Sequence, residues 1–447
     1  MDVSRRSFIA GTLGTAAAVA LASCSSSSSG GAAGSTGAAG TKSSVGPVKG
    51  ALTFAFWGGS AGETAGFTNA KTKFEAANPG ATVNLTVVPY DGFFAGIDRG
   101  LQAGNAPDLW RVDYTNIGKY SSKSTLLDMT PYFSQSEIDA FLPALWNAIK
   151  FDGKPYGVPH QTDTTCIVYD KAAFATAGIT AVPDKLESAW TWEEFGAVAD
   201  KLKASLPANK FPFAYDWTAA GAFRWLNWLY QAGGTLLNED QTKCAFPNDG
   251  ATKAMDFTKS FFDKKWVPQT NTIKGAKYSD EFYLAQTVPM TFIGDFLVPE
   301  LADPKSGAKG EWGATFMPQD KAAASDLGGN AIVANAGTKN ADLAAAFLKF
   351  LVAEPQMKYF CEQAIELPTL KSLASEDLQY AVRPEIMKLF AAQAGTVSET
   401  VVKESTVPAF NKINTILQDQ LELAFHGQSS ADTISHISDG VTTALSA

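Results

Sequence analysis

Histidine and cysteine are scarce in this chain, and its excess charge is acidic. Only three histidines occur among 447 residues (His160, His426 and His436), and none has a cysteine or second histidine at the short spacing of a zinc site. Four cysteines are too few for a disulfide scaffold in a chain of this length. A formal net charge of −9 argues against a nucleic-acid-binding protein, which would present basic patches to phosphates. The sequence therefore predicts neither a metal site nor a nucleic-acid partner.

The N-terminal segment has no apolar run long enough to predict a transmembrane helix. Arg5 and Arg6 precede an apolar run over 8–22, which is short and interrupted by glycine and threonine. A positive end, a short apolar stretch and small residues together predict an export signal over 1–23. The sequence SRRSFI within it resembles a twin-arginine signal, whose cargo is exported in the folded state.

Cys24 follows the apolar run directly. The four residues Leu-Ala-Ser-Cys that end there resemble a bacterial lipobox, in which the cysteine becomes the lipidated first residue of the mature protein. Residues 24–49 are mostly serine, glycine, alanine and threonine, which bury too little apolar surface to fold. We therefore expect an extracytoplasmic body that a lipid on Cys24 and a flexible tether anchor to the cell membrane. At most one disulfide can form among Cys166, Cys244 and Cys361, and no spacing singles out a pair.

From residue 50 onward, strand-like and helix-like segments alternate. Apolar runs at 52–57, 83–87 and 109–112 predict strands, and helical periodicity lies between them. This order implies a parallel sheet covered by helices. Further strands are predicted at 166–169, 288–293 and 331–334, and further helices from 192 to 202 and at 223–230, 342–352, 411–425 and 431–445. Since no flexible linker follows residue 50, two domains would be joined by short crossings.

Motifs typical of enzymes are few. The chain has no glycine-rich dinucleotide or phosphate loop, so no cofactor is expected. A Gly-x-Ser-x-Gly match over 58–62 puts Ser60 between a predicted strand and a helix, which is the context of a nucleophile elbow. No oxyanion-hole motif accompanies it, and a glycine-rich turn is the favoured interpretation. A pair of carboxylates that converge in space would also suit a glycosidase, because such residues need no fixed spacing.

Aromatic residues stand beside glycine or aspartate at predicted strand ends and loops. A flat ring buries the apolar face of a sugar, and a carboxylate accepts hydrogen bonds from its hydroxyls. Ligand crevices form at the carboxyl ends of strands in α/β folds, so these pairs are candidate contacts. They are Trp57-Gly58-Gly59, Tyr90-Asp91, Asp113-Tyr114, Asp216-Trp217 and Gly294-Asp295-Phe296.

Several longer motifs follow one another in a specific order. They are FEAANPG at 74–80, GNAPDL at 104–109, GKPYGVP at 153–159, VYDK at 168–171, TWEEF at 191–195, Met290 to Phe296, Gly328-Gly329, and TKN at 338–340. With these motifs, residues 50–447 resemble the extracellular solute-binding proteins of bacterial ABC importers, the carbohydrate-binding family that includes maltose-binding protein.

The resemblance implies an α/β fold of the type II periplasmic-binding-protein class. Each of two lobes would be a sheet flanked by helices, with a hinge between the lobes and a cleft that closes on the ligand. Lobe one would comprise 50–160 and 331–371, and lobe two 161–330 and 372–447. It also implies a monomeric receptor, not an enzyme, that captures a mono- or oligosaccharide and delivers it to the membrane permease of an importer.

The resemblance assigns site residues one at a time. Trp57, Gly58, Gly59 and Ser60 match the loop after the first strand, which lines the cleft. Asp113 follows a strand where family members place ligand contacts, and Asp163 stands where sugar binders often carry a carboxylate. Phe296 matches an aromatic platform that is often tryptophan, and Gly328-Gly329 would let the backbone approach a ligand. Further candidates are Tyr90, Asp91, Trp217 and Asp295.

Two other functions stay open at the level of sequence. The same receptor could carry a non-sugar solute: glycerol phosphate, for which Arg111 and Arg224 are the nearest cations, or a polyamine, which the aspartate–aromatic pairs would suit. A secreted hydrolase that uses Ser60 or two carboxylates is the less favoured alternative.

Overall fold

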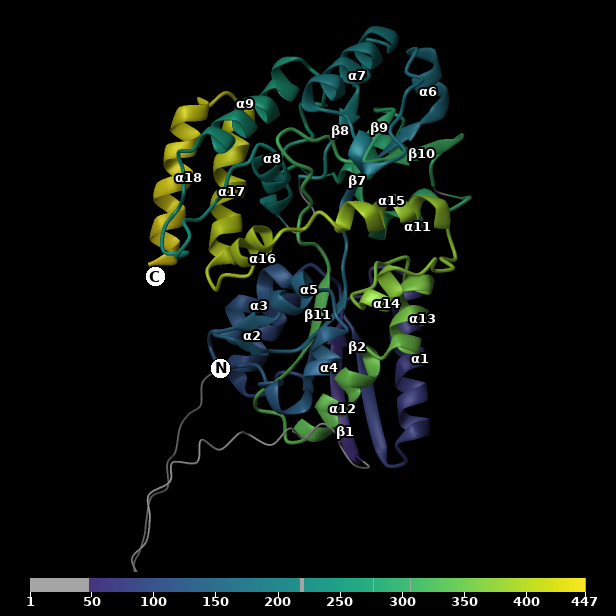
Figure 1. Cartoon of the computed structure of the whole chain (residues 1–447), viewed down its shortest axis with the longest axis vertical. Coiled ribbons are helices and arrows are strands. Elements are labelled where there is room, and N and C mark those ends of the chain that lie inside the picture. Colours follow the sequence, from purple (N-terminus) through teal and green to yellow (C-terminus); the bar gives the residue numbers. More distant parts are fainter. Residues whose placement is uncertain (1–47, 218–220, 276, 306, 447) are drawn as a thin grey trace, which may run out of the picture. The chain divides into compact units, whose positions relative to one another are not determined.

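The computed structural model describes residues 48–217, 221–275, 277–305 and 307–446 (Figure 1). The predicted export signal, Cys24 and all but the end of the predicted tether lie outside the described residues. Within the part that is described, no helix is both long and apolar enough to cross a membrane.

The first sheet has five strands in the order β2-β1-β3-β11-β6. Their bounds are β1 (Gly50–Phe56), β2 (Ala81–Val87), β3 (Leu109–Asp113), β6 (Val158–Gln161) and β11 (Asn330–Ala334). β1 pairs with β2 and β3 in parallel, whereas β11 is antiparallel to both β3 and β6. The prediction of a parallel sheet is therefore confirmed for β1, β2 and β3, and among the five strands only β11 runs antiparallel to the others. The physical reason is that β11 enters from the second sheet instead of following a helical crossover.

Helices pack on the first sheet through aromatic contacts. Ser60 and Glu63 form a capping box that begins α1 (Ala61–Ala77), and the helix ends before Pro79. The ring of Phe67 on this helix lies 5.1 Å from that of Phe54 on β1. The other elements of this region are α2 (Phe93–Ala103), α3 (Tyr114–Ser121), η1 (Thr130–Tyr132), α4 (Gln135–Asp139), α5 (Pro143–Ala148), β4 (Lys150–Phe151), β5 (Lys154–Pro155), α12 (Ala341–Leu351), α13 (Glu354–Ala364) and α14 (Lys371–Ala374).

The second sheet has four strands in the order β10-β7-β9-β8. β7 (Thr165–Asp170) is antiparallel to both β9 (Met290–Gly294) and β10 (Trp312–Thr315), and the short β8 (Phe213–Ala214) is parallel to β9. The helices and turns around it are α6 (Lys171–Thr176), η2 (Leu186–Ser188), α7 (Trp192–Ser205), α9 (Asp249–Asp263), α10 (Ser279–Leu284), η4 (Asp295–Leu297), α11 (Val298–Leu301) and α15 (Pro384–Ala394).

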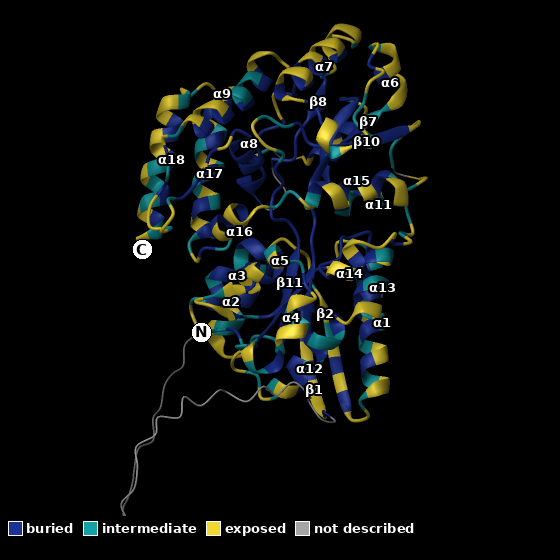
Figure 2. Ribbon diagram, in the orientation of Figure 1, coloured by how far each residue is buried: buried dark blue, intermediate teal, exposed yellow. Residues whose placement is uncertain are grey.

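The aromatic stretch at 223–230 forms two short helical pieces, η3 (Ala222–Trp225) and α8 (Leu226–Gln231). Trp225 and Trp228 are fully buried in the core, and the ring of Trp228 lies 5.8 Å from that of Phe292 on β9. α17 (Phe410–Phe425) and α18 (Ser430–Leu445) pack on each other and on α9, after α16 (Glu399–Ser405). Most strands are buried, whereas β2 and the start of β1 carry exposed residues, as do the outward faces of many helices (Figure 2).

The chain crosses between the two sheets three times. It crosses from β6 to β7, from β10 to β11, and from α13, which packs on α1, to α15, which packs on β7. Thr162 joins all three crossings: its Oγ1 donates to the carbonyl of Gly328 (3.1 Å), and its backbone exchanges hydrogen bonds with Leu367. The two sheets are therefore joined by three segments that hydrogen-bond to one another at Thr162.

The three cysteines of the described residues are buried and unbridged. Burial raises the pKa of the Cys166 and Cys361 thiols well above the ordinary value, and that of Cys244 to about 11. Cys166 is a small core residue, since its side chain is fully buried in β7.

Candidate ligand-binding site

A cavity of about 350 Å³ lies where the carboxyl ends of β1 and β3 meet helices and turns that surround the second sheet. Its volume is in the range of small-molecule sites. The wall combines aromatic rings, amides, carboxyl groups and two arginines. It comprises Trp57, Gly59, Ser60, Glu63, Tyr90, Arg111, Asp113, Gln161, Asp163, Arg224, Tyr278, Phe296, Leu297, Pro299, Glu300, Asn330, Ala364 and Glu366.

Arg111 organises the first-sheet side of the cavity. Its Nη2 donates to Oε1 of Glu63 at 2.8 Å, and its Nη1 donates to the carbonyl of Trp57 at 3.1 Å. The guanidinium also stacks on the Trp57 ring, 4.6 Å from the centroid. Burial raises the pKa of Glu63, but Arg111 and the hydrogen bond from Gly59 outweigh it, and the net shift is downward. The ion pair thus fixes both the tryptophan and the loop that begins α1.

Asp113 is the centre of a polar network at the end of β3. Its Oδ2 accepts from the Tyr90 hydroxyl at 2.8 Å, and its Oδ1 accepts from Nδ2 of Asn330 at 2.8 Å. The Asn330 amide oxygen in turn accepts from Nε2 of Gln161 at 2.7 Å. Burial raises the pKa of Asp113 to about 6, although Tyr90 and Arg111 partly oppose this. The network presents several oriented donors and acceptors to the cavity.

Arg224 organises the second-sheet side, among three carboxylates. Its Nη2 lies 3.2 Å from Asp163, and its Nε lies 3.6 Å from Asp326 and 3.8 Å from Asp216. Burial raises the pKa of Asp163 to about 7; Arg224 lowers it, and Asp326 raises it further. One buried cation is therefore shared by more negative charge than it can neutralise.

Glu366 adds a buried carboxyl group to the wall after α13. Its side chain is 1% exposed, and its Oε2 has no hydrogen-bond partner among the described residues. Burial raises the pKa of Glu366 well above its ordinary value, and Asp295, Glu63 and Asp163 add to the shift. A ligand that donates to this oxygen would satisfy a group that is otherwise costly to bury.

Four aromatic rings reach the cavity from both sheets. Trp57 is nearly buried, whereas Tyr90 and Tyr278 are 36% and 46% exposed. Phe296 lies on η4, and its ring centroid is 5.7 Å from the Arg224 guanidinium. Flat apolar faces beside polar groups suit a ligand with an apolar face and a polar rim.

The structure brings most of the predicted site residues together at this cavity. Those that line it are Trp57, Gly59, Ser60, Tyr90, Asp113, Asp163 and Phe296. The Ser60 hydroxyl accepts from the backbone N–H of Glu63 at 3.2 Å, so its local task is to cap α1.

Other predicted residues lie outside the wall. Trp217 is 1% exposed and packs in the core, 4.2 Å from the Tyr215 ring and 4.9 Å from the Phe425 ring. Asp295 is fully buried, where it accepts from the backbone N–H of Thr164 at 2.8 Å. Asp91 is exposed on the surface. The aspartate–aromatic pattern does not distinguish a core position from a cavity position, because the local sequence is the same in both.

The predicted glycines support the wall without lining it, apart from Gly59. A side chain at Gly328 would meet Oδ1 of Asp163 at 1.9 Å, and one at Gly329 would meet the Thr162 backbone at 2.4 Å. Gly329 also has a φ of +95°, which strains other residues. A side chain at Gly58 would meet Thr64 at 2.6 Å. Gly328 and Gly329 need glycine because a carboxylate or backbone lies against them, whereas the neighbour of Gly58 is a threonine hydroxyl.

Several wall residues were not predicted as sugar contacts. Asn330 begins an antiparallel strand, so its side chain reaches the edge where parallel strands end. The sequence indicates Arg111, like Arg224 below, only as a contact for an anionic ligand. The others are Glu63, Gln161, Arg224, Tyr278, Leu297, Pro299, Glu300, Ala364 and Glu366. The capping box at Ser60 and Glu63 was the one local signal that could have indicated Glu63.

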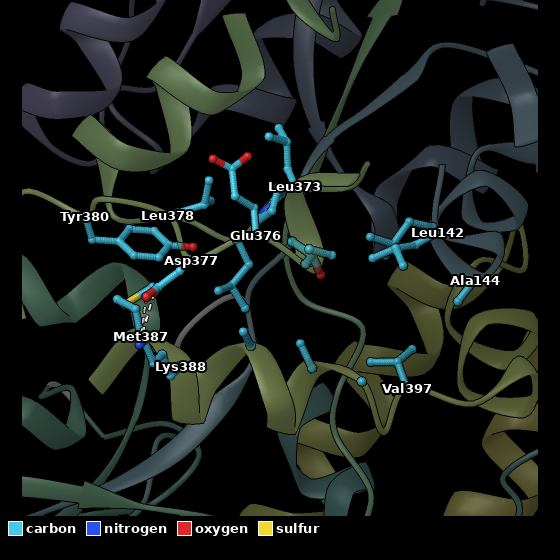
Figure 3. Close-up of a pocket in the computed structure, with 18 of the residues that line it drawn as sticks. Leu142, Ala144, Leu373, Glu376, Asp377, Leu378, Tyr380, Met387, Lys388 and Val397 are labelled. Atoms are coloured by element: carbon cyan, nitrogen blue, oxygen red, sulfur yellow. Dashed lines mark hydrogen bonds and ion pairs between the residues drawn. The ribbon is translucent and has the colours of Figure 1, made fainter. Parts of the chain in front are cut away.

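A second cavity, of about 410 Å³, is walled mainly by apolar residues from α14, α15 and the start of α5 (Figure 3). Leu142, Leu373, Leu378 and Met387 contribute to it, and Asp377 pairs with Lys388 at its edge at 3.0 Å. No residue predicted for the site is in its wall. The smaller cavity, where rings and buried polar groups converge, is the better ligand site.

The fold and this cavity define a solute-binding protein of the type II class. A family model described as "Bacterial extracellular solute-binding protein" matches residues 58–358. The chain belongs to this family, which confirms the resemblance seen in the sequence.

Individual proteins share both sequence and fold with the chain. A binding protein of Brucella abortus is 24% identical over 379 residues, 82% of this chain and 86% of its own. The maltodextrin-binding protein of Bacillus subtilis is 26% identical over 313 residues, 67% of this chain and 69% of its own. The structure of an ABC substrate-binding protein from Listeria monocytogenes in complex with cycloalternan has a TM-score of 0.75 at 20% identity. That comparison covers 88% of this chain and 98% of the other. The predicted fold class is confirmed.

Proposed function

We propose that this protein captures a mono- or oligosaccharide outside the cytoplasm and delivers it to the permease of an ABC importer. The observation that carries the proposal is the cavity itself, where the Trp57 and Phe296 rings lie beside the network of Asp113, Asn330 and Gln161. Rings bury the apolar faces of a sugar, and the amides and carboxylate pair with its hydroxyls. The maltodextrin and cycloalternan bound by similar proteins support a carbohydrate ligand here.

The arginines favour a neutral sugar over a phosphate compound. Arg111 is paired with Glu63 at 2.8 Å, and Arg224 lies within 3.8 Å of Asp163, Asp216 and Asp326. A phosphate would have to displace these carboxylates or bind beside them in a buried space, which like-charge repulsion opposes. Glycerol phosphate is therefore the less favourable ligand.

Ser60 supports binding in preference to hydrolysis. Its hydroxyl is engaged in the capping box of α1. No histidine is in the cavity wall among the described residues, and the neighbouring Glu63 carboxylate is paired with Arg111. We infer that the protein is a receptor without catalytic activity.

We further propose that the lobes close about the three crossings at Thr162. Lobe one would be 50–160 and 331–371, and lobe two 161–330 and 372–447. The crossings at 162–164 and 316–329 lie near these boundaries, and wall residues come from both sides. A ligand that contacts both lobes would shift the equilibrium toward the closed form.

The anchor is proposed from sequence alone. A lipid on Cys24 would hold the monomeric receptor on the cell membrane after cleavage of the twin-arginine signal. Expression of the full chain with and without Cys24→Ala tests this: the wild-type chain should partition with membranes and incorporate labelled palmitate, and the variant should be released. Membrane retention of the variant would contradict the anchor.

Thermal shift with a panel of mono- and oligosaccharides, glycerol phosphate and polyamines tests the ligand class. A sugar at 100 times its Kd should stabilise the protein by about 2.7 kcal/mol. Phe296→Ala should weaken binding of that sugar roughly threefold to tenfold. Tyr359→Ala, on α13 outside the cavity wall, is the matched control and should leave the affinity unchanged. Stabilisation by a non-sugar alone would refute carbohydrate capture.

A further inference from the structure

The wall of the 350 Å³ cavity carries more acid than base. Five carboxyl side chains line it, and two arginines are the only basic side chains among the described wall residues. The carboxyl groups are those of Glu63, Asp113, Asp163, Glu300 and Glu366.

Both arginines are already committed to carboxylates. Arg111 pairs with Glu63, and Arg224 is shared by Asp163 with Asp216 and Asp326, which lie behind the wall. The positive charge of both arginines is therefore balanced by carboxylates of the protein itself. What remains at the wall is Asp113, Glu300 and Glu366, and none of these makes an ion pair within the described part of the chain.

Among these three carboxyl groups, Glu366 is the strongest candidate for contact with a cationic ligand. Its side chain is almost completely buried, it lines the cavity, and its Oε2 has no described hydrogen-bond partner. Burial raises its pKa, and Asp295 and Glu63 add to the shift; Arg111 opposes it only in part, because its charge is paired with Glu63. An ammonium group bound here would be a strong, charge-assisted donor.

Further carboxyl groups lie behind and beside the wall, and a bound cation would favour their ionised form. Burial raises the pKa of Asp280 to about 7, and Glu300 and Asp216 increase it further. Asp295 is fully buried, and its pKa is also well raised, by burial and by Asp163. Fields of one sign concentrate in a low-dielectric cleft and favour ligands of the opposite charge. The rings of Trp57, Tyr90, Tyr278 and Phe296 offer faces that also attract cations.

We propose that the ligand is a carbohydrate that bears a protonated amine, with the ammonium group held by Glu366 and its charge complemented by Asp113 and Glu300. This inference rests on the proposed carbohydrate function. A hydroxyl could also donate to Glu366, but it supplies no positive charge to stabilise the ionised form of this buried carboxyl group. An ammonium group supplies both the donor and the charge.

The test uses matched sugars in which amino groups replace hydroxyl groups and nothing else changes. Titration calorimetry compares glucose with glucosamine, galactose with galactosamine, and cellobiose with the disaccharide of two β-1,4-linked glucosamine units, at pH 7. Maltodextrins, putrescine and spermidine complete the panel. In the pair that binds, the amino sugar should bind about tenfold to a hundredfold more tightly, as one charge-assisted hydrogen bond provides.

Glu366→Gln should collapse the preference to threefold or less, because the amide keeps the shape and removes the charge. If this variant does not fold, Asp113→Asn should reduce the preference in the same direction. Glu311→Gln is the matched control, because Glu311 has an 86% exposed side chain outside the cavity wall and its loss should leave the ratio unchanged.

The remaining outcomes separate this inference from the proposed function. The neutral sugar of a pair could bind as tightly as the amino sugar or more tightly, or neutral maltodextrins alone could bind. Either result would refute the proposal of an amino sugar and leave carbohydrate capture intact. Binding of putrescine or spermidine without any sugar would overturn both. Absence of binding by every sugar would refute carbohydrate capture itself.

Discussion

The two buried arginines of the cavity are neutralised in different ways. Arg111 has one carboxylate partner, Glu63 at 2.8 Å, together with the Trp57 carbonyl and ring. Arg224 lies among Asp163, Asp216 and Asp326 at 3.2 to 3.8 Å. The first arrangement balances its charge, and the second leaves an excess of acid. On the first-sheet side, the charge of the arginine is matched by one carboxylate. On the second-sheet side, the protonation of the carboxyl groups can change with pH and with the charge of a bound ligand.

Removal of Arg224 should cause the largest loss of stability. Arg224→Met leaves three buried carboxylates without their cation, and we expect a cost near 5 kcal/mol, the upper end for a broken buried ion pair. Chemical denaturation measures the change in the free energy of unfolding. Lys274→Met, which removes an exposed ion pair with Asp419, is the control and should leave the midpoint almost unchanged. A small effect of Arg224→Met would show that the carboxylates are protonated and need no partner.

Removal of Arg111 should cost less, near 3 kcal/mol, since only Glu63 loses its partner. The double variant Arg111→Met/Glu63→Gln should recover much of this loss, because the unpaired charge is removed while the amide oxygen can still accept from Gly59. Denaturation of the two variants side by side measures the recovery. If the double variant were less stable than the single variant, the charge of Glu63 would not be the source of the cost.

Asp163 should make stability depend on pH. Its pKa is raised to about 7 in the folded state, so the folded state holds a proton that the unfolded state has lost. Stability from this group is therefore full below about pH 4 and falls, by up to about 1.4 kcal/mol per pH unit, as pH rises to about 7. Asp113, with a pKa raised to about 6, acts in the same direction.

His160 should change the free energy of unfolding with pH in the opposite direction. Burial lowers its pKa to about 3, so its contribution grows as pH rises toward its unfolded value of about 6.5. The difference between wild type and Asp163→Asn isolates the aspartate: the gap in unfolding free energy should change between pH 5 and 7.5 in favour of the variant. Parallel pH profiles would show that Asp163 is ionised throughout this range.

The smallest effect concerns Ser60. Ser60→Ala removes an N-cap and should cost about 1 kcal/mol. Ser429→Ala is the matched control, because Ser429 caps α18 in the same way, by accepting from the backbone N–H of Asp432. Both variants should lower the melting temperature similarly, and only Ser60→Ala should also weaken ligand binding. Equal affinities would place the ligand away from the α1 loop.

Local patterns predicted the elements well, because hydrophobic periodicity is set by neighbours in sequence. Strands at 52–57 and 109–112 and the helix at 342–352 lie within two residues of β1, β3 and α12. The pairing direction of β11 was not predictable in this way. Its apolar run fits a parallel or an antiparallel neighbour equally, and its direction depends on a chain path from the other sheet.

The site was predictable where a residue follows a strand of the parallel part. Trp57 and Asp113 follow β1 and β3, whose carboxyl ends meet at one edge. Glu366 and Tyr278 come to the cavity from segments far away in sequence, and nothing local distinguishes them from surface residues. Trp217 shows the converse: an aspartate–aromatic pair that packs in the core.

The buried thiols have a practical consequence for measurement. Cys166, Cys244 and Cys361 are all buried, and their raised pKa values keep the reactive thiolate scarce at neutral pH. A single cysteine introduced at the exposed cavity rim, as in Glu300→Cys, would therefore react first with a maleimide dye. A body expressed without the N-terminal segment could thus become an optical sensor that reports its own ligand, with no native cysteine replaced.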